Sequence, residues 1–195
     1  MATGKQLQVC SLLRWGLFAL ATAIVTGCST ITLISDYDAD TDKQLTALQQ
    51  STDAFTSKMM AEIPKWDKGK KSPKNSYDSQ KKFYAEFDEK LRLLEFRVQS
   101  IPKNSQTKKL VSDIRAAVLL QDEQEKQCEE GGLTLKDGEE ARFSSLQSIH
   151  CLKENKATGP SRTALEISQR NVNQIIGAAL ALEVAKKQGA ESNKQ

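Results

Sequence analysis

The chain has 195 residues and a formal net charge of +3, from 28 basic and 25 acidic side chains. Only 6% of the residues are aromatic and the mean hydropathy is −0.51, which excludes a multispan membrane protein and disfavours a β-sandwich or barrel. The nearly balanced charge disfavours a nucleic-acid-binding protein, and the single His weakens every mechanism that needs two imidazoles. This length predicts one domain.

Residues 1–27 have the pattern of a secretory signal peptide. Lys5 and Arg14 supply positive charge, no acidic residue occurs in the segment, and a mostly apolar run extends from Trp15 to Thr26. This run is shorter than the roughly 20 apolar residues that a membrane-spanning helix needs. It leads into the tetrapeptide Val25-Thr26-Gly27-Cys28.

This tetrapeptide resembles the lipobox of bacterial lipoproteins, in which a branched apolar residue and small residues precede a Cys. The resemblance is confined to the leader; it implies cleavage before Cys28 by signal peptidase II and acylation of Cys28. Several acyl chains anchor a protein stably, because each buried CH₂ contributes about 0.8 kcal/mol. The residue after Cys28 is Ser29 and not Asp. In the sorting pattern of such lipoproteins, this implies the periplasmic face of a Gram-negative outer membrane. The alternative is an uncleaved anchor, or an ordinary signal peptide with an incidental Cys.

The sequence after the leader predicts an all-α fold: a bundle of four main helices plus one shorter helix. We expect a lipidated tether at residues 28–36, a single helical domain at 37–188 and a flexible tail at 189–195. Prolines and glycines divide the domain, and apolar residues recur between them at steps of three and four, the helical period. The first expected helix begins between Tyr37 and Asp42 and ends at Ile63. It is followed by helices at Tyr77–Ser100, Gln106–Cys128, the shorter Asp137–Lys153, and Ser161–Gln188. Connections are expected at Pro64–Ser76 and Glu154–Pro160.

The second expected helix has the clearest pattern, and its seam predicts the core. The buried faces are expected at Leu45, Leu48, Phe55 and Met59; at Tyr84, Phe87, Leu91, Leu94, Val98 and Ile101; at Leu110, Ile114, Ala117 and Val118; and at Leu165, Val172, Ile175, Ala179 and Leu182.

Two cysteines remain after Cys10 leaves with the leader and Cys28 receives lipid. In an oxidising compartment, Cys128 and Cys151 are expected to form a disulfide. The alternative is a pair of free or metal-binding thiols beside His150, although adjacent His and Cys give poor ligand geometry and no fourth ligand is apparent.

The connection after the first helix is rich in lysine. The possible contact residues for an anionic surface or a partner are Lys65, Trp66, Lys68, Lys70, Lys71 and Lys74. Lysines attract phosphates and Trp favours interfaces, so an anionic lipid, lipopolysaccharide or an acidic partner fits this loop. The alternative is a solvated loop that only keeps the protein soluble.

Other polar patterns point to structure rather than chemistry. Asp36, Asp38, Asp40 and Asp42 alternate as in the start of a calcium-binding loop, but the required Gly and terminal Glu are missing, so helix capping is favoured. The nucleophile adjacent to His150 is Cys151, which is expected to be oxidised, and no recognised catalytic motif appears in the sequence. We therefore expect no catalytic residue, no metal site and no cofactor.

These observations favour a non-catalytic, lipid-anchored interaction or scaffold module of the cell envelope with a protein partner, and no nucleic acid. An alternative is an immunity or exclusion lipoprotein that neutralises an incoming toxin or phage component by binding. A third hypothesis is an envelope hydrolase. The sequence leaves the oligomeric state open.

Overall fold

The computed structural model describes residues 34–134 and 145–192, which form an all-α fold, as the sequence predicts. Within these ranges no helix is long and apolar enough to cross a membrane. The four long helices are α2 (Ala39–Ala61), α3 (Tyr77–Ser100), α4 (Ser105–Val118) and α8 (Arg162–Ser192).

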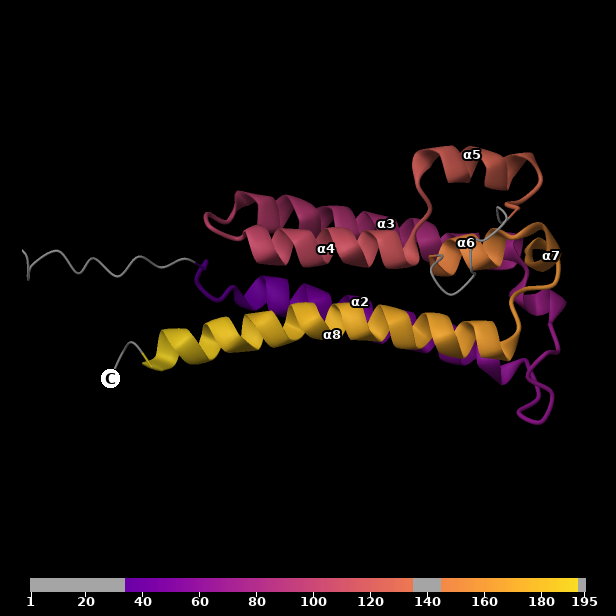
Figure 1. Cartoon of the computed structure of the whole chain (residues 1–195), viewed down its shortest axis with the longest axis horizontal. Coiled ribbons are helices and arrows are strands. Elements are labelled where there is room, and N and C mark those ends of the chain that lie inside the picture. Colours follow the sequence, from indigo (N-terminus) through magenta and orange to yellow (C-terminus); the bar gives the residue numbers. More distant parts are fainter. Residues whose placement is uncertain (1–33, 135–144, 193–195) are drawn as a thin grey trace, which may run out of the picture. The chain divides into compact units, whose positions relative to one another are not determined.

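The long helices pack as an antiparallel four-helix bundle. Contacts link α2 with α3, α3 with α4, α4 with α8 and α8 back to α2 (Figure 1). The start of α8 lies at the end of α2, where the Arg162 guanidinium donates to the Met60 carbonyl, and Asn173 farther along donates to Asp53. The α2–α8 pair is therefore antiparallel.

Short elements cap the end of the bundle at which α2 ends and α3 begins (Figure 1). They are η1 (Pro73–Asn75), α5 (Asp122–Glu130), α6 (Leu146–Cys151) and α7 (Lys153–Lys156).

Local signals set several helix ends. The Asp38 carboxylate accepts a hydrogen bond of 3.0 Å from the Thr41 amide, which caps the first turn of α2. Helix α3 ends at Ser100 because Ile101 precedes Pro102 and is extended, the conformation that a following proline imposes. The observed bounds of α3 are those expected from the sequence.

The predicted core is confirmed for the first three faces, with Ile101 and Leu110 only partly buried, and for Leu165, Val172 and Ala179 of α8, but not for Ile175 and Leu182. Ile175 and Leu182 are half-buried, whereas their neighbours Ile176 and Glu183 face the core. The buried stripe of α8 consists of Leu165, Ser168, Val172, Ile176, Ala179, Glu183 and Lys186. It steps by three and four, so the helical period was correct, and the two wrong positions, Ile175 and Leu182, each lie one residue before the residue that is buried.

The expected helix Gln106–Cys128 is two helices. The backbone is extended at Leu119, and α5 starts again at Asp122. No proline or glycine marks the break. Instead, the side-chain oxygen of Gln147 accepts the Leu120 amide at 2.9 Å and replaces a helical hydrogen bond.

The remaining boundaries also shift. The first part of the expected helix Asp137–Lys153 falls on residues 135–144, outside the described ranges, and the described helix begins at Leu146. Helix α7 occupies part of the expected connection Glu154–Pro160, and α8 continues beyond Gln188 to Ser192.

The last residues of the expected tether belong to the fold. Ser35 is buried; its amide donates to the Lys103 carbonyl at 3.1 Å and its hydroxyl donates to the Asn104 side chain at 2.8 Å. The chain therefore joins the bundle at the turn between α3 and α4, opposite the short elements.

Candidate functional site

Cys128 and Cys151 form a disulfide, as expected, with their Cα atoms 5.8 Å apart. The link joins α5 to the end of α6. A parallel bridge lies beside it, where Leu133 donates to the Cys151 carbonyl at 2.9 Å and accepts from the Lys153 amide at 3.0 Å. Lys156 adds a hydrogen bond from its ammonium to the Cys128 carbonyl. These contacts hold α5 onto the rest of the fold.

His150 is a structural residue, fully buried beneath this link. Its Nε2 faces the Asn75 carbonyl, which only accepts, so Nε2 carries the proton. Nδ1 then accepts the Tyr84 hydroxyl proton at 2.9 Å. Burial lowers the pKa of His150 to about 4, against the opposing effect of the Asn75 carbonyl, and burial also raises the pKa of Tyr84. Both ring nitrogens are engaged, so the imidazole is not free to act as a base.

Asn75 links His150 to the lysine-rich connection. Its side-chain amide donates to the Met59 carbonyl at 2.9 Å. Gly159 lies directly against it with φ +73°, and a Cβ there would approach the Asn75 carbonyl oxygen to 2.6 Å. The closing end of the lysine-rich connection is thus fixed by close packing.

The lysine-rich connection is folded onto the bundle by two successive turns and three lysines. Backbone bonds run from the Asp67 amide to the Pro64 carbonyl and from the Lys70 amide to the Asp67 carbonyl. Three lysines contact groups on the bundle, although the side chains of Lys68 and Lys74 stay largely exposed. The Lys68 ammonium contacts the Glu166 carboxylate at 3.1 Å, and the Lys74 ammonium contacts the Glu62 carboxylate at 3.0 Å. The Lys71 ammonium donates to the Glu154 carbonyl at 2.9 Å.

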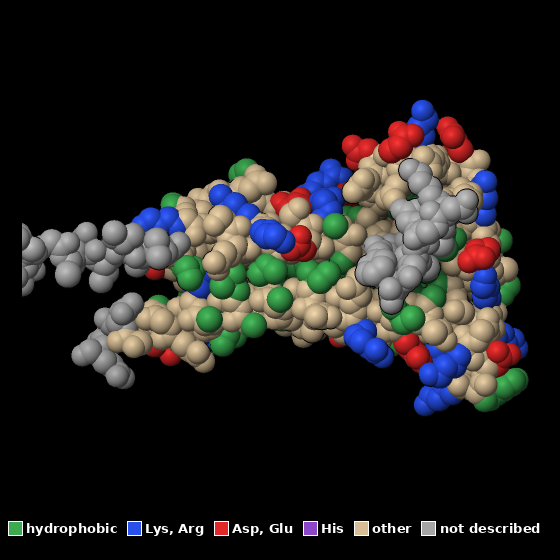
Figure 2. Space-filling view, in the orientation of Figure 1, with side chains coloured by type: hydrophobic (Ala, Val, Ile, Leu, Met, Phe, Trp, Pro, Cys, Tyr) green, Lys and Arg blue, Asp and Glu red, His purple; other side chains and the backbone are tan. Residues whose placement is uncertain are grey.

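The other members of the predicted contact set face outward. Trp66 is 85% exposed, and the side chains of Lys65 and Lys70 are exposed and make no hydrogen bond or ion pair with any described residue. We call Lys65, Trp66 and Lys70 the tip. In Figure 2, Lys and Arg side chains gather at the end of the bundle that carries this connection. The structure therefore divides the six predicted residues into three lysines that contact the bundle and a tip that makes no such contact with a described residue.

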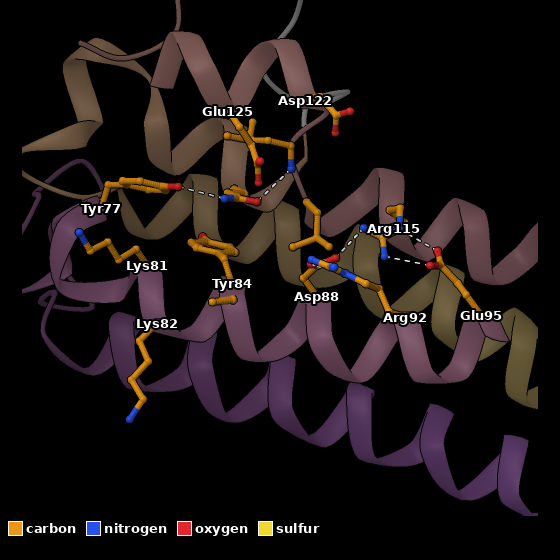
Figure 3. Close-up of a pocket in the computed structure, with 14 residues that line it drawn as sticks. Tyr77, Lys81, Lys82, Tyr84, Asp88, Arg92, Glu95, Arg115, Asp122 and Glu125 are labelled. Carbon is orange, nitrogen blue, oxygen red and sulfur yellow. Dashed lines mark hydrogen bonds and ion pairs between the residues drawn. The ribbon is translucent and has the colours of Figure 1, made fainter. Parts of the chain in front are cut away.

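An open groove of about 940 Å³ lies between α3, the Leu119–Gln121 break, α5 and α6 (Figure 3). Sequence reasoning missed this groove, because it depends on the unpredicted break. Its lining includes Tyr77, Lys81, Tyr84, Asp88, Arg92, Glu95, Arg115, Asp122, Glu125 and Gln147.

Two arginines and two carboxylates along the groove pair with one another. Arg115 donates two bonds to Glu95, at 2.7 and 2.9 Å, and one to Asp88 at 2.7 Å. Burial opposes ionisation of Asp88, but hydrogen bonds from Arg92 and Arg115 outweigh it and lower its pKa. These contacts link α3 to α4. Lys81, Asp122 and Glu125 also line the groove and form no ion pair with a described residue.

A second feature that sequence reasoning missed is a buried charged cluster where the chain joins the bundle. The Lys186 ammonium donates to Glu183 at 2.7 Å, Thr107 at 2.7 Å and Asn104 at 2.8 Å. Thr107 also donates to Glu183, and Asn104 accepts from Ser35. The side chains of Glu183 and Lys186 are 1% and 4% exposed. Their i, i+3 spacing looks like an ordinary surface ion pair in the sequence.

The acidic run serves the start of α2, as the capping interpretation predicts. Arg97 pairs with Asp38 at 2.6 Å and with Asp40 at 3.0 Å, and Tyr37 donates to Asp42 at 2.9 Å. The hydrogen bond from Arg97 is the main cause that holds the pKa of Asp38 well below its usual range. The described residues contain no group of three or more His, Cys, Asp or Glu arranged to hold a metal ion.

Cys28 lies outside the described ranges, so its acylation stays a prediction. Comparison with protein-family models, curated proteins and solved structures found no match to this chain.

Proposed function

We propose that this chain is a lipid-anchored, non-catalytic interaction module on the periplasmic face of a Gram-negative outer membrane. The observation that carries the proposal is Val25-Thr26-Gly27-Cys28 at the end of a basic, apolar leader. Cys28 lies only seven positions before Ser35, which is fastened into the bundle by two hydrogen bonds. An acyl anchor at Cys28 would therefore hold one end of the bundle close to the membrane.

The buried polar groups of the described residues support a binding role over catalysis. His150, the single imidazole, has both nitrogens engaged and a lowered pKa. In the groove, Arg115 is paired with Asp88 and Glu95. The tip presents an exposed indole, Trp66, and two exposed lysines, Lys65 and Lys70, on the surface, where they suit contact with a partner.

The test is processing of the full chain in a Gram-negative host fed with labelled palmitate. We expect label in the mature protein, recovery in the outer-membrane fraction and loss of both in a Cys28→Ser variant. Cys10→Ser is the matched control, because Cys10 lies in the expected leader and should be dispensable. Unchanged labelling and fractionation of Cys28→Ser would refute the anchor. Crosslinking in intact cells should then recover a partner with the parent chain.

A further inference from the structure

We propose that the tip (Lys65, Trp66 and Lys70) binds a carboxylate-bearing glycan of the peptidoglycan type on the side of the bundle away from the anchoring membrane. This inference rests on the proposed envelope location.

The tip is presented on a braced loop. Two backbone turns and the Asn75–Gly159 contact shape the connection, and three lysines add weaker, partly exposed contacts with the bundle, so the exposure of Trp66 is not that of a loose segment. An indole that is 85% exposed leaves a large apolar face in water. A ligand that covers this face gains burial and loses little loop entropy.

The residue types at the tip match an anionic sugar polymer. The negative face of an indole attracts the weakly positive C–H groups on the flat face of a pyranose ring. Lys65 and Lys70 carry point charges that suit carboxylates on the same polymer. Asp67 lies between them and opposes part of this charge, so affinity for polyanions in general is reduced and the aromatic contact becomes decisive.

Placement distinguishes this ligand from the lipid that holds the anchor. Helix α2 has 23 residues and separates Asp38 from the loop that carries the tip, a length of about 35 Å at 1.5 Å per residue. The six residues from Cys28 to Leu33 span at most about 20 Å when fully extended. Since the chain joins the bundle at the opposite end from the tip, the reach of this segment limits how far an anchor at Cys28 can lie from Ser35. The tip lies farther from Ser35 than this segment can reach.

The experiment measures sedimentation of the full-length, detergent-solubilised protein with purified insoluble peptidoglycan sacculi. We expect Trp66→Ala to weaken binding at least about tenfold, as for an aromatic anchor. The double variant Lys65→Ala/Lys70→Ala should weaken binding and reduce its salt dependence. The matched controls are Phe96→Ala, an aromatic residue 76% exposed on α3, and Lys126→Ala on α5; both should bind like the parent. Circular dichroism confirms that each variant is folded.

Two further arms identify the ligand chemistry. Chitin offers the sugar without carboxylates, and vesicles of phosphatidylglycerol offer anionic lipid without sugar. The proposal predicts that Trp66→Ala changes binding to sacculi most, to chitin less, and to vesicles not at all. A Trp66-dependent difference confined to vesicles, or sacculus binding that survives Trp66→Ala, would overturn it.

The Cys28→Ser variant separates this inference from the proposed function. Sacculus binding is expected to persist in that variant, because the tip needs no lipid. If the parent chain is not acylated but binds sacculi through Trp66, the proposed anchor is wrong and the glycan site stands. If the parent chain is acylated but shows no Trp66-dependent binding, the anchor stands and the glycan site is wrong.

Discussion

Replacing Lys186 by Met tests the buried cluster that holds the start of the domain. The ammonium of Lys186 donates hydrogen bonds to Glu183, Thr107 and Asn104 and is almost completely shielded from water. The second carboxylate oxygen of Glu183 already lacks a partner among the described residues. Met matches the length of the lysine stem but carries no charge, so the variant leaves a buried carboxylate without its counter-ion.

The expected cost is large. Removing one partner of a buried ion pair typically destabilises a protein by about 3–5 kcal/mol, because an uncompensated charge stays in a poorly polarisable environment. Replacing both partners, with Glu183→Leu and Lys186→Met, removes that charge. The Thr107 hydroxyl then loses two partners, at about 1–3 kcal/mol. The double variant should therefore be more stable than Lys186→Met, by roughly 2 kcal/mol.

Urea unfolding followed by circular dichroism measures these differences. Lys109→Met is the control, since Lys109 pairs with Asp113 on the surface and its side chain is 75% exposed. A change below about 0.5 kcal/mol is expected there. If Lys186→Met lost less than 1 kcal/mol, or if the double variant were less stable than the single one, the cluster would not be the charged core element described above.

Three further perturbations test the other end of the bundle. Cys128→Ser/Cys151→Ser should lower the free energy of unfolding by about 3 kcal/mol, the chain-entropy value for a separation of 23 residues, while most helical circular dichroism remains; a melting curve unchanged by the substitution would contradict this. Because the pKa of His150 is lowered to about 4, the unfolded state takes up a proton below about pH 6.5 before the folded state does, so stability should fall by roughly 2 kcal/mol from pH 7 to pH 5. This loss should disappear in His150→Gln, measured by urea unfolding at both pH values. Gly159→Ala should destabilise by at least about 1 kcal/mol through its positive φ and its clash with Asn75, whereas Gly69→Ala, whose Cβ would meet only Asp67 at 3.8 Å, should be neutral in the same assay.

Local patterns sufficed for α3 because its determinants lie within the segment itself. Its apolar seam and Pro102 are both read directly from neighbouring residues. The break after Val118 could not be found in this way. It depends on Gln147, which lies 27 residues beyond the Leu120 amide that it binds. A tertiary contact of this kind leaves no trace in hydrophobic periodicity.

Charged residues on α8 show a second limit. A stripe is located by its apolar members, and Glu183 and Lys186 look like surface residues by that criterion. They are buried because each satisfies the other and because Thr107 and Asn104 supply further hydrogen-bonding groups from another part of the chain. The predicted register consequently favoured Leu182, the apolar neighbour, over Glu183.

The lysine-rich loop illustrates why composition found a candidate site without resolving it. The braces depend on Glu166 and Glu154, which lie 98 and 83 residues from their lysines. If the division into braces and tip is correct, Lys68→Met/Lys74→Met should weaken binding to sacculi only through a looser loop. Exposed ion pairs contribute little, so a loss of at most about fivefold is expected, with salt dependence retained. A loss as large as that of Trp66→Ala would show that these lysines contact the glycan themselves, and the tip would then have to include them.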